Sequence, residues 1–338
     1  MRKILLFIVF ALCMIDANAQ TVKINGLTYN LDSDGMTATI TSGTYGDVMI
    51  PATVTYNDNK YNVVGVGYKG FSYANVTSVI VLSKKFKTIT ADAFEYCSNI
   101  KMFYAPTTEM IGKYAFYNCV GLDSVAIQNV KNLDCAAFGY CSKVKRIESK
   151  SLTTVGDNAF VGCSSLVSVD LDNVVSVGGD AFMSCTSLKK VFLPNVKTIG
   201  SGTFRDDNSI ESIYLGQNLE RLYDYTFYNC SKVKSFTCCV EIPPITTSTT
   251  FAGMDKASCV LYVPEESVEY YKMAVNWKDF KNIKPIKNEA TGIMPVKKDM
   301  IVDVYSVSGS LIMKNTTIEQ AKQRLKGVYI VSNKKIIF

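Results

Sequence analysis

A five-residue phrase, Ala-Phe-x-x-Cys, recurs along this chain at intervals of 22 residues and constrains its fold more than any other feature. The full copies place phenylalanines at Phe94, Phe116, Phe138, Phe160 and Phe182. Less complete copies continue the series at Phe71, Phe204, Phe227 and Phe251. Because a regular period of this length marks a stack of similar units, we expect each copy to contact chiefly its two neighbours.

A second phrase, apolar-x-x-apolar-x-apolar, follows each copy of the first. It is seen at residues 122–127, 166–171 and 188–193. A period of about 20–29 residues containing this phrase is typical of a leucine-rich-repeat solenoid, in which each coil adds one short strand to a parallel sheet. Since one coil cannot bury its own Phe and Leu side chains, stacking supplies the core and both ends need caps. The pattern predicts about eight or nine such coils.

The joining of AFxxC to LxxVxL, repeated in register over roughly residues 60–285, resembles the BspA-type leucine-rich repeat of bacterial surface proteins. That family includes adhesins that bind host matrix proteins or other bacteria. The resemblance therefore implies a secreted or cell-surface binding protein whose partner is an extracellular protein. An alternative is a surface polysaccharide-binding accessory protein for nutrient capture, which would need exposed aromatic rings to stack on sugars. In either case we expect a monomer.

Composition along the chain predicts the order of its segments. Residues 1–19 read as a signal peptide, because two basic residues precede an apolar stretch and a small-residue cleavage site. We expect a β-rich N-terminal cap over residues 20–70, with a turn at 32–35, and the solenoid over residues 71–285. A linker over 286–300 and a small β domain over 301–338 follow. No later segment is apolar enough to be an integral membrane segment.

The end of the solenoid predicts a short helical cap. Residues 265–275 place Val268, Tyr271 and Val275 on one helical face. The only tryptophan, Trp277, follows, and we expect it to plug the end of the stack rather than to hold a ligand.

Strand-like runs after residue 300 continue to Phe338 at the very end of the sequence. They resemble the C-terminal sorting domain of the type IX secretion system, which implies a position at the cell surface, associated with the outer membrane, or release from it. The alternative is a small β module that merely ends the protein.

Composition also excludes several kinds of chemistry. The chain has no histidine, which removes histidine-paired nucleophiles and histidine metal sites. No phosphate-binding glycine motif is present. We therefore expect no enzyme, no cofactor and no metal site. Residues 20–289 carry 26 basic and 26 acidic side chains, and such a neutral body is unsuited to nucleic acid.

Six cysteines share one repeat position: Cys97, Cys119, Cys141, Cys163, Cys185 and Cys230. We expect them to form a column of buried free thiols, because parallel side chains suit disulfide geometry poorly. One coil lacks this cysteine, and its Asp206-Asp207 pair is expected to form a turn.

The strand phrase predicts which residues face outward, since successive strand side chains alternate between the two faces. One outward column runs through Lys190, and the next contains Tyr104, Phe192 and Tyr214. Aromatic rings are enriched at binding hot spots. The candidate binding face is therefore Tyr104, Lys190, Phe192 and Tyr214. The alternative is that these rings are simply good strand formers, or that residues 290–338 cover them.

Overall fold

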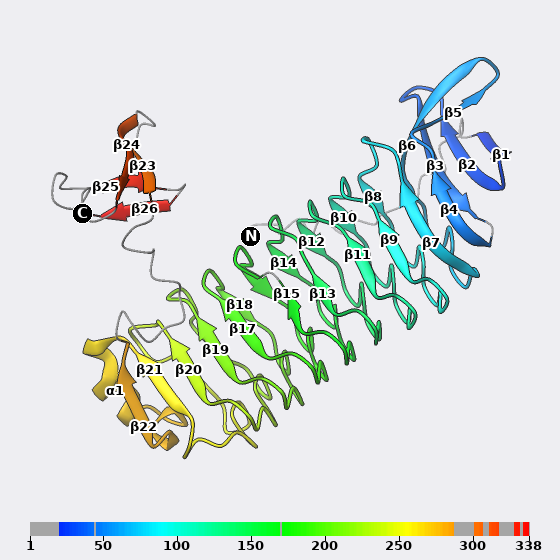
Figure 1. The fold of residues 1–338 in the computed structure, drawn as a ribbon. Helices are drawn as coiled ribbons and strands as arrows, with labels where there is room; N and C mark the ends of the chain where they lie inside the picture. The colour runs from blue at the N-terminus through cyan, green and yellow to red at the C-terminus, as the bar shows by residue number, and fades with distance from the viewer. Residues whose placement is uncertain are drawn as a thin grey trace, which may run out of the picture. The chain divides into compact units, whose positions relative to one another are not determined.

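The computed structural model describes residues 20–286 apart from 44 and 170, together with the backbone of four strands between residues 301 and 337. The chain divides into two compact units, Met1–Lys284 and Pro285–Phe338. The expected signal peptide and nearly all of the expected linker lie outside the described residues. The first unit contains the whole repeat array (Figure 1).

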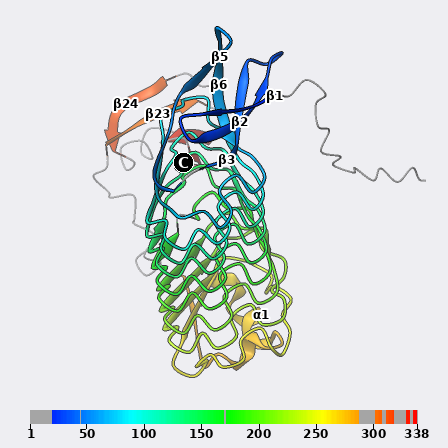
Figure 2. The same cartoon turned by 90° about the vertical axis from the view of Figure 1, so that its right-hand side faces the viewer.

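The N-terminal end is an antiparallel arrangement of β1 (Gln20–Ile24), β2 (Leu27–Asp32) and β3 (Thr37–Ser42). At the predicted turn, Asp32 accepts hydrogen bonds from the backbone N–H groups of Asp34 and Gly35 at 3.0 and 3.1 Å. A second hairpin, β5 (Thr53–Tyr56) with β6 (Asn59–Val66), projects from the same end (Figure 2). Because β3 pairs with β6 in parallel, this β cap continues directly into the array.

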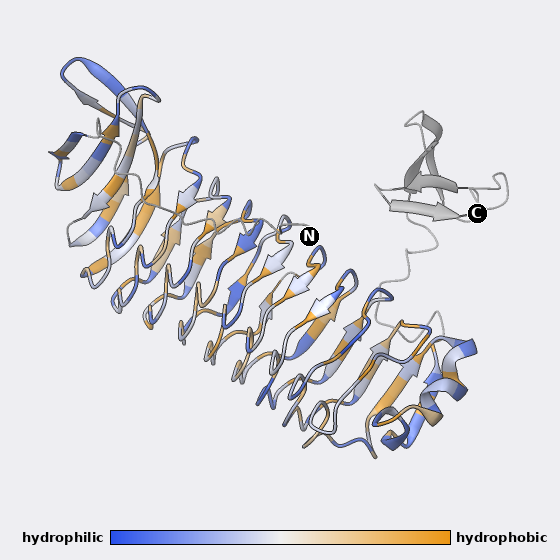
Figure 3. Cartoon of the chain, turned by 180° about the vertical axis from the view of Figure 1, so that it is seen from behind, coloured by the Kyte–Doolittle hydropathy of each residue, from blue (hydrophilic) through white to orange (hydrophobic). Residues whose placement is uncertain are grey.

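Each coil has two strand-bearing sides. The shorter strands form one parallel sheet that extends from β6: β8 (Thr88–Ile89), β10 (Met110–Ile111), β12 (Asn132–Leu133), β14 (Thr154–Val155), β16 (Ser176–Val177) and β18 (Thr198–Ile199). The strand phrase forms the other side, here called the LxxVxL side: β4 (Gly46–Ile50), β7 (Val76–Val81), β9 (Met102–Tyr104), β11 (Ser124–Ala126), β13 (Arg146–Ile147), β15 (Ser168–Val169), β17 (Lys190–Leu193), β19 (Ser212–Leu215), β20 (Ser235–Cys238), β21 (Val260–Val263) and β22 (Asn282–Pro285). Hydrophobic residues recur at similar places in successive coils (Figure 3).

The described part of the chain forms a β-solenoid of about 11 turns, so the prediction of eight or nine was too low. Part of the difference arises at the N-terminal end, where β4 pairs in parallel with β7. Residues expected to belong only to the N-terminal cap therefore add to the stack.

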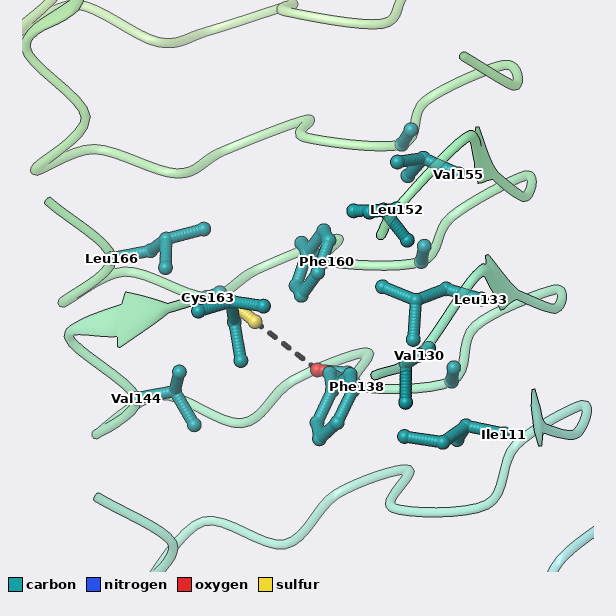
Figure 4. Close-up of a cluster of buried hydrophobic side chains, with 14 of the residues drawn as sticks. Ile111, Val130, Leu133, Phe138, Val144, Leu152, Val155, Phe160, Cys163 and Leu166 are labelled. Carbon is teal, nitrogen blue, oxygen red and sulfur yellow. Dashed lines mark hydrogen bonds between the residues drawn. The ribbon is translucent and has the colours of Figure 1, made fainter. Parts of the chain in front are cut away.

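The repeated phenylalanines and cysteines form two buried columns. Neighbouring rings from Phe71 to Phe204 stack with centroids 5.0–5.7 Å apart. Beside them, each repeat cysteine donates its thiol hydrogen to the carbonyl of a phenylalanine in the preceding coil, as Cys163 does to Phe138 (Figure 4). All six cysteines of this column are buried and free, which confirms the expected thiol column.

The C-terminal cap consists of η1 (Glu265–Ser267), α1 (Val268–Met273) and η2 (Trp277–Asp279). Trp277 is 1% exposed, packs at 4.8 Å against the Phe251 ring and donates its indole N–H to the Pro244 carbonyl at 2.8 Å. The expected plug is confirmed. The helix ends at Met273, because the backbone of Ala274 is extended. Val275 therefore lies outside the helix and is exposed. The prediction that Val275 shares the buried helical face was wrong.

The second unit contains a four-stranded antiparallel sheet. Its strands are β23 (Ile301–Ser306), β24 (Leu311–Thr317), β25 (Val328–Val331) and β26 (Lys334–Ile337), in the order β24-β23-β25-β26. A small β domain was expected here, but β24 was not among the expected strands. Its second half is polar, which weakens the strand signal in the sequence.

Candidate binding face on the LxxVxL side

Residues that point away from the core on the LxxVxL side form the two columns that strand alternation requires. Pairing of β17 with β19 aligns Lys190 with Ser212 and Phe192 with Tyr214. Val191 lies between the two outward residues of β17 and is buried. The register derived from the repeat phrase is therefore the register of the described strands in these coils.

Phe192 and Tyr214 contact each other across adjacent strands. Their ring centroids are 4.8 Å apart and their planes are tilted by 32°. Phe192 is 36% exposed, whereas Tyr214 is half-buried and its hydroxyl accepts a hydrogen bond from the Cys239 thiol at 3.1 Å. Burial raises the pKa of Tyr214, so its hydroxyl stays protonated at neutral pH. The pair thus offers an apolar ring surface with one polar group at its edge.

The structure brings three of the four candidate residues into one area. Lys190 is exposed on β17, on the same outward side as Phe192 and two residues before it. Tyr104 is also exposed, but it lies on β9, four coils earlier. It pairs with Ile80 and Ala126, so it belongs to a separate part of the face.

The LxxVxL side is interrupted, which the sequence analysis did not foresee. Its described strands form three groups, β4 to β11, β13 with β15, and β17 to β22. At the first interruption the outward residues are Ala126 and Glu148, and both are weak strand formers compared with Tyr or Phe. The same coil also has Ser149 at an inner position, where its hydroxyl donates to the Val130 carbonyl at 2.6 Å. In the sequence, the small and charged residues at these outward positions are the feature that could have predicted the interruption.

A hollow of about 620 Å³ lies over β13 and β15, between these interruptions. Ile147 and Val169 give it apolar lining, and Arg146, Glu148 and Lys150 give it charges of both signs. Arg146 and Glu148 pair at 3.2 Å, but their side chains are 66% and 63% exposed. Such a pair adds little stability, so both charges stay available to a ligand. β17 follows β15 by one coil, which places the hollow beside the strand that bears Lys190 and Phe192.

One carboxyl group lies inside the array. Asp207 occupies the repeat position of the cysteines, is fully buried, and has no hydrogen-bond partner at either oxygen. Burial raises its pKa well above the usual range. The expected turn at Asp206-Asp207 is present, since the Asp207 N–H donates to the Phe204 carbonyl at 3.3 Å. The repeat directs the Asp207 side chain inward, which was not expected. A group so enclosed has no access to a substrate. Within residues 20–286 as described, no cluster of acidic or cysteine side chains is arranged to hold a metal ion.

Comparison with known proteins identifies the repeat. Residues 64–174 and 137–258 match the repeat pattern of the family described as the BspA-type leucine-rich repeat region. No curated protein sequence matches the chain. Among the helices described, none is long and apolar enough to cross a bilayer.

Several solved structures resemble the chain. A leucine-rich cell surface protein from Faecalibacterium prausnitzii is 20% identical, with coverage of 80% of this chain and 96% of that one, and a TM-score of 0.45. The leucine-rich-repeat protein of T. pallidum is 22% identical over 69% and 89% of the two chains, with a TM-score of 0.38. The pneumococcal vaccine antigen PcpA is 14% identical over 80% and 99%, with a TM-score of 0.34.

Proposed function

Because the chain belongs to the family of BspA-type leucine-rich-repeat proteins, we propose that it is an exported protein that binds another protein on the LxxVxL side of its coils. The contact between Phe192 and Tyr214 carries this proposal. Two paired strands hold these rings together, so little conformational freedom is lost when a partner binds. Rigid aromatic groups of this kind contribute much of the free energy at protein interfaces. The proposed function is recognition, without chemistry on the partner.

The partner we propose is a host matrix protein or a surface protein of another cell, as for an adhesin. The hollow over β13 and β15 supports a protein as partner, because it combines apolar lining with Arg146, Glu148 and Lys150 on the same side of the coils as Phe192. An apolar centre with a polar, charged surround is typical of protein interfaces. The balanced charge of residues 20–289 disfavours nucleic acid.

We further propose that the protein acts at the cell surface or in the medium. The sequence of residues 1–19 supports export, and the similar F. prausnitzii protein is described as a cell surface protein. The antiparallel strands of Pro285–Phe338 would act as a type IX sorting signal, associating the protein with the outer membrane or releasing it. The repeat array would work as a monomer.

An array of purified extracellular matrix proteins and glycans, probed with the full chain, tests the proposed function. We expect saturable binding to at least one protein, and competition by the same protein in solution. A protein-binding role is contradicted if no protein on the array is bound, or if glycans alone are bound.

A further inference from the structure

A ridge of tyrosines lies on the AFxxC turns, away from the LxxVxL side. We define the tyrosine ridge as Tyr73, Tyr96, Tyr117 and Tyr140. Neighbouring rings touch along the whole ridge, with centroids 4.9, 5.8 and 5.5 Å apart. The first two rings are parallel within 10°, and Tyr117 stands at 73° and 85° to the rings on either side. Successive coils thus contribute one ring each to a continuous aromatic surface.

The ridge is open to solvent. Tyr73, Tyr96 and Tyr140 are 70%, 36% and 45% exposed. The stacked phenylalanine column, rather than these tyrosines, fills the interior of the same coils. The core therefore does not explain why rings are present at the outer positions.

The backbone argues that these tyrosines are not there for stability. Tyr73, Tyr96 and Tyr140 have φ values of 58°, 57° and 58°, in the left-handed region. This region favours glycine and asparagine and costs other residues about 1 kcal/mol or more. Four other coils use the favoured types at the equivalent position, namely Asn118, Gly162, Asn229 and Gly253, and two carry the small polar residues Ser184 and Asp206 there. Residues held in such strained conformations point to function.

The coils that follow leave room for the rings. A Cβ atom at Gly139 would lie 3.0 Å from the ring of Tyr117, and one at Gly162 would lie 2.7 Å from the ring of Tyr140. A larger residue at either position would displace the ring. Glycine at these two places gives the rings of Tyr117 and Tyr140 the room that they occupy.

Charges of both signs lie near the ridge. The Tyr68 hydroxyl raises the pKa of Lys69, and Asp92 and Glu95 lie close enough to add to this rise. Lys113 lies over the ring of Tyr114 at 5.1 Å, and Tyr114 in turn touches Tyr117 at 5.2 Å. Because charges of both signs lie near the ridge, it suits an uncharged ligand better than a polyanion or a polycation.

We propose that the tyrosine ridge binds a neutral, extended polysaccharide. The C–H groups of pyranose rings can pack against the solvent-exposed atoms of these rings, and phenol hydroxyls exchange hydrogen bonds with sugar hydroxyls. A coil step of about 4.8 Å is close to the length of one sugar residue in an extended chain, so successive tyrosines can meet successive sugars. This site lies on a different side of the coil from Phe192 and Tyr214, so it does not depend on the proposed protein-binding function.

Affinity electrophoresis of the full chain, in native gels that contain mixed-linkage β-glucan, xylan or mannan, tests this inference. The test variant is Tyr96→Asn with Tyr140→Asn, because asparagine occupies the same backbone conformation at Asn118 and Asn229. We expect at least one polysaccharide to retard the wild type and the double variant to bind at least tenfold more weakly. Its melting temperature should be equal or higher, since strain is relieved. Tyr73→Ala, at the most exposed end of the ridge, gives an independent test if the double variant does not fold.

The matched control is Tyr225→Asn. Tyr225 is also an exposed tyrosine with positive φ, and Asn158 occupies its equivalent position in another coil, but it lies several coils away from the ridge. This variant should be retarded like the wild type, and retardation should persist in 0.5 M NaCl because no net charge is involved. The inference is overturned if no polysaccharide retards the wild type, if the double variant is retarded equally, or if salt abolishes the effect.

Discussion

The thiol of Cys163 donates a hydrogen bond to the carbonyl oxygen of Phe138, in the preceding coil, at a distance of 3.1 Å. Burial raises the pKa of this thiol well above its usual value, so it stays protonated and able to donate. Equivalent bonds at 2.9–3.1 Å join the other column cysteines to their preceding coils. The cysteine column therefore links neighbouring coils through hydrogen bonds as well as through packing.

The first prediction concerns thiol reactivity. Only the thiolate reacts readily, so the six column thiols should resist Ellman's reagent in the folded protein at pH 8. Cys135 and Cys239 are partly exposed and should react first. Titration before and after denaturation in guanidinium checks this. Rapid reaction of the column thiols without denaturant would contradict their burial.

Cys163→Ala should also lower the free energy of unfolding by about 1–2 kcal/mol, through the lost hydrogen bond and the cavity.

The second prediction concerns Asp207, which interrupts the cysteine column. In the unfolded chain this carboxyl ionises near a pKa of about 3.9, whereas burial keeps it protonated to higher pH in the folded chain. The folded state therefore holds the extra proton, and stability falls as pH rises above about 4. Replacing Asp207 with Asn removes this pH-dependent loss of stability, because the amide does not ionise. The melting temperature of the Asp207→Asn variant should match that of the wild type near pH 4 and exceed it at pH 7.5.

Asp206→Asn is the matched control for this experiment. It makes the same chemical change one residue earlier, at a side chain that is 36% exposed and pairs with Arg205 at 3.3 Å. Losing this exposed ion pair lowers stability slightly as pH rises, so this variant should not gain melting temperature over the wild type between pH 4 and pH 7.5. Equal pH dependence in the two variants would refute the assignment of a buried neutral carboxyl to Asp207.

The third prediction concerns the C-terminal plug. Trp277 packs on Phe251 and donates to the Pro244 carbonyl, so Trp277→Ala should destabilise the last coils by about 3–5 kcal/mol. Because each coil depends on its neighbours, the loss should spread inward from this end. Relative to the wild type, the Trp277→Ala variant should show a larger increase in the hydrogen-exchange rate in β20 and β21 than in β8 and β10. Uniform acceleration along the whole array would argue against a local capping role.

The fourth prediction concerns residues 290–338. They lie within the second compact unit and follow β22, and the array already ends on the Trp277 plug, so deleting them should leave the melting temperature of the array unchanged. If they are an export signal, the truncated protein should accumulate in the periplasm. Fractionation of cells expressing both forms measures this. Normal arrival of the truncated form at the surface would remove the basis for the sorting proposal.

The repeat made most of the fold predictable. Phenylalanines at a constant interval fix the coil length, and the strand phrase fixes the register that places Phe192 beside Tyr214. The turn at Asp32 and the plug at Trp277 followed from local chemistry. The helix end before Val275 did not, because that boundary depends on how the last turn meets the array rather than on periodicity.

The surface features were harder to predict. The interruption beside Ala126 and Glu148 reflects the strand preferences of several coils together, and no single coil reveals it. The tyrosine ridge joins positions such as Tyr96 and Tyr117, which are 21 residues apart and occupy different places in the repeat phrase. Their contact follows from side-chain direction, which only the structure provides.

The affinity of the Phe192→Ser, Tyr214→Ser double variant for the protein identified on the array tests the central claim most directly. We predict that its Kd rises at least tenfold, or about 1.4 kcal/mol, because the contacting ring pair is lost. Its melting temperature should stay within a few degrees of the wild type. Met110→Ser, at an exposed position on β10 of the other sheet, should leave the Kd unchanged. An unchanged Kd in the double variant, with the fold intact, would contradict the claim that the partner binds this face.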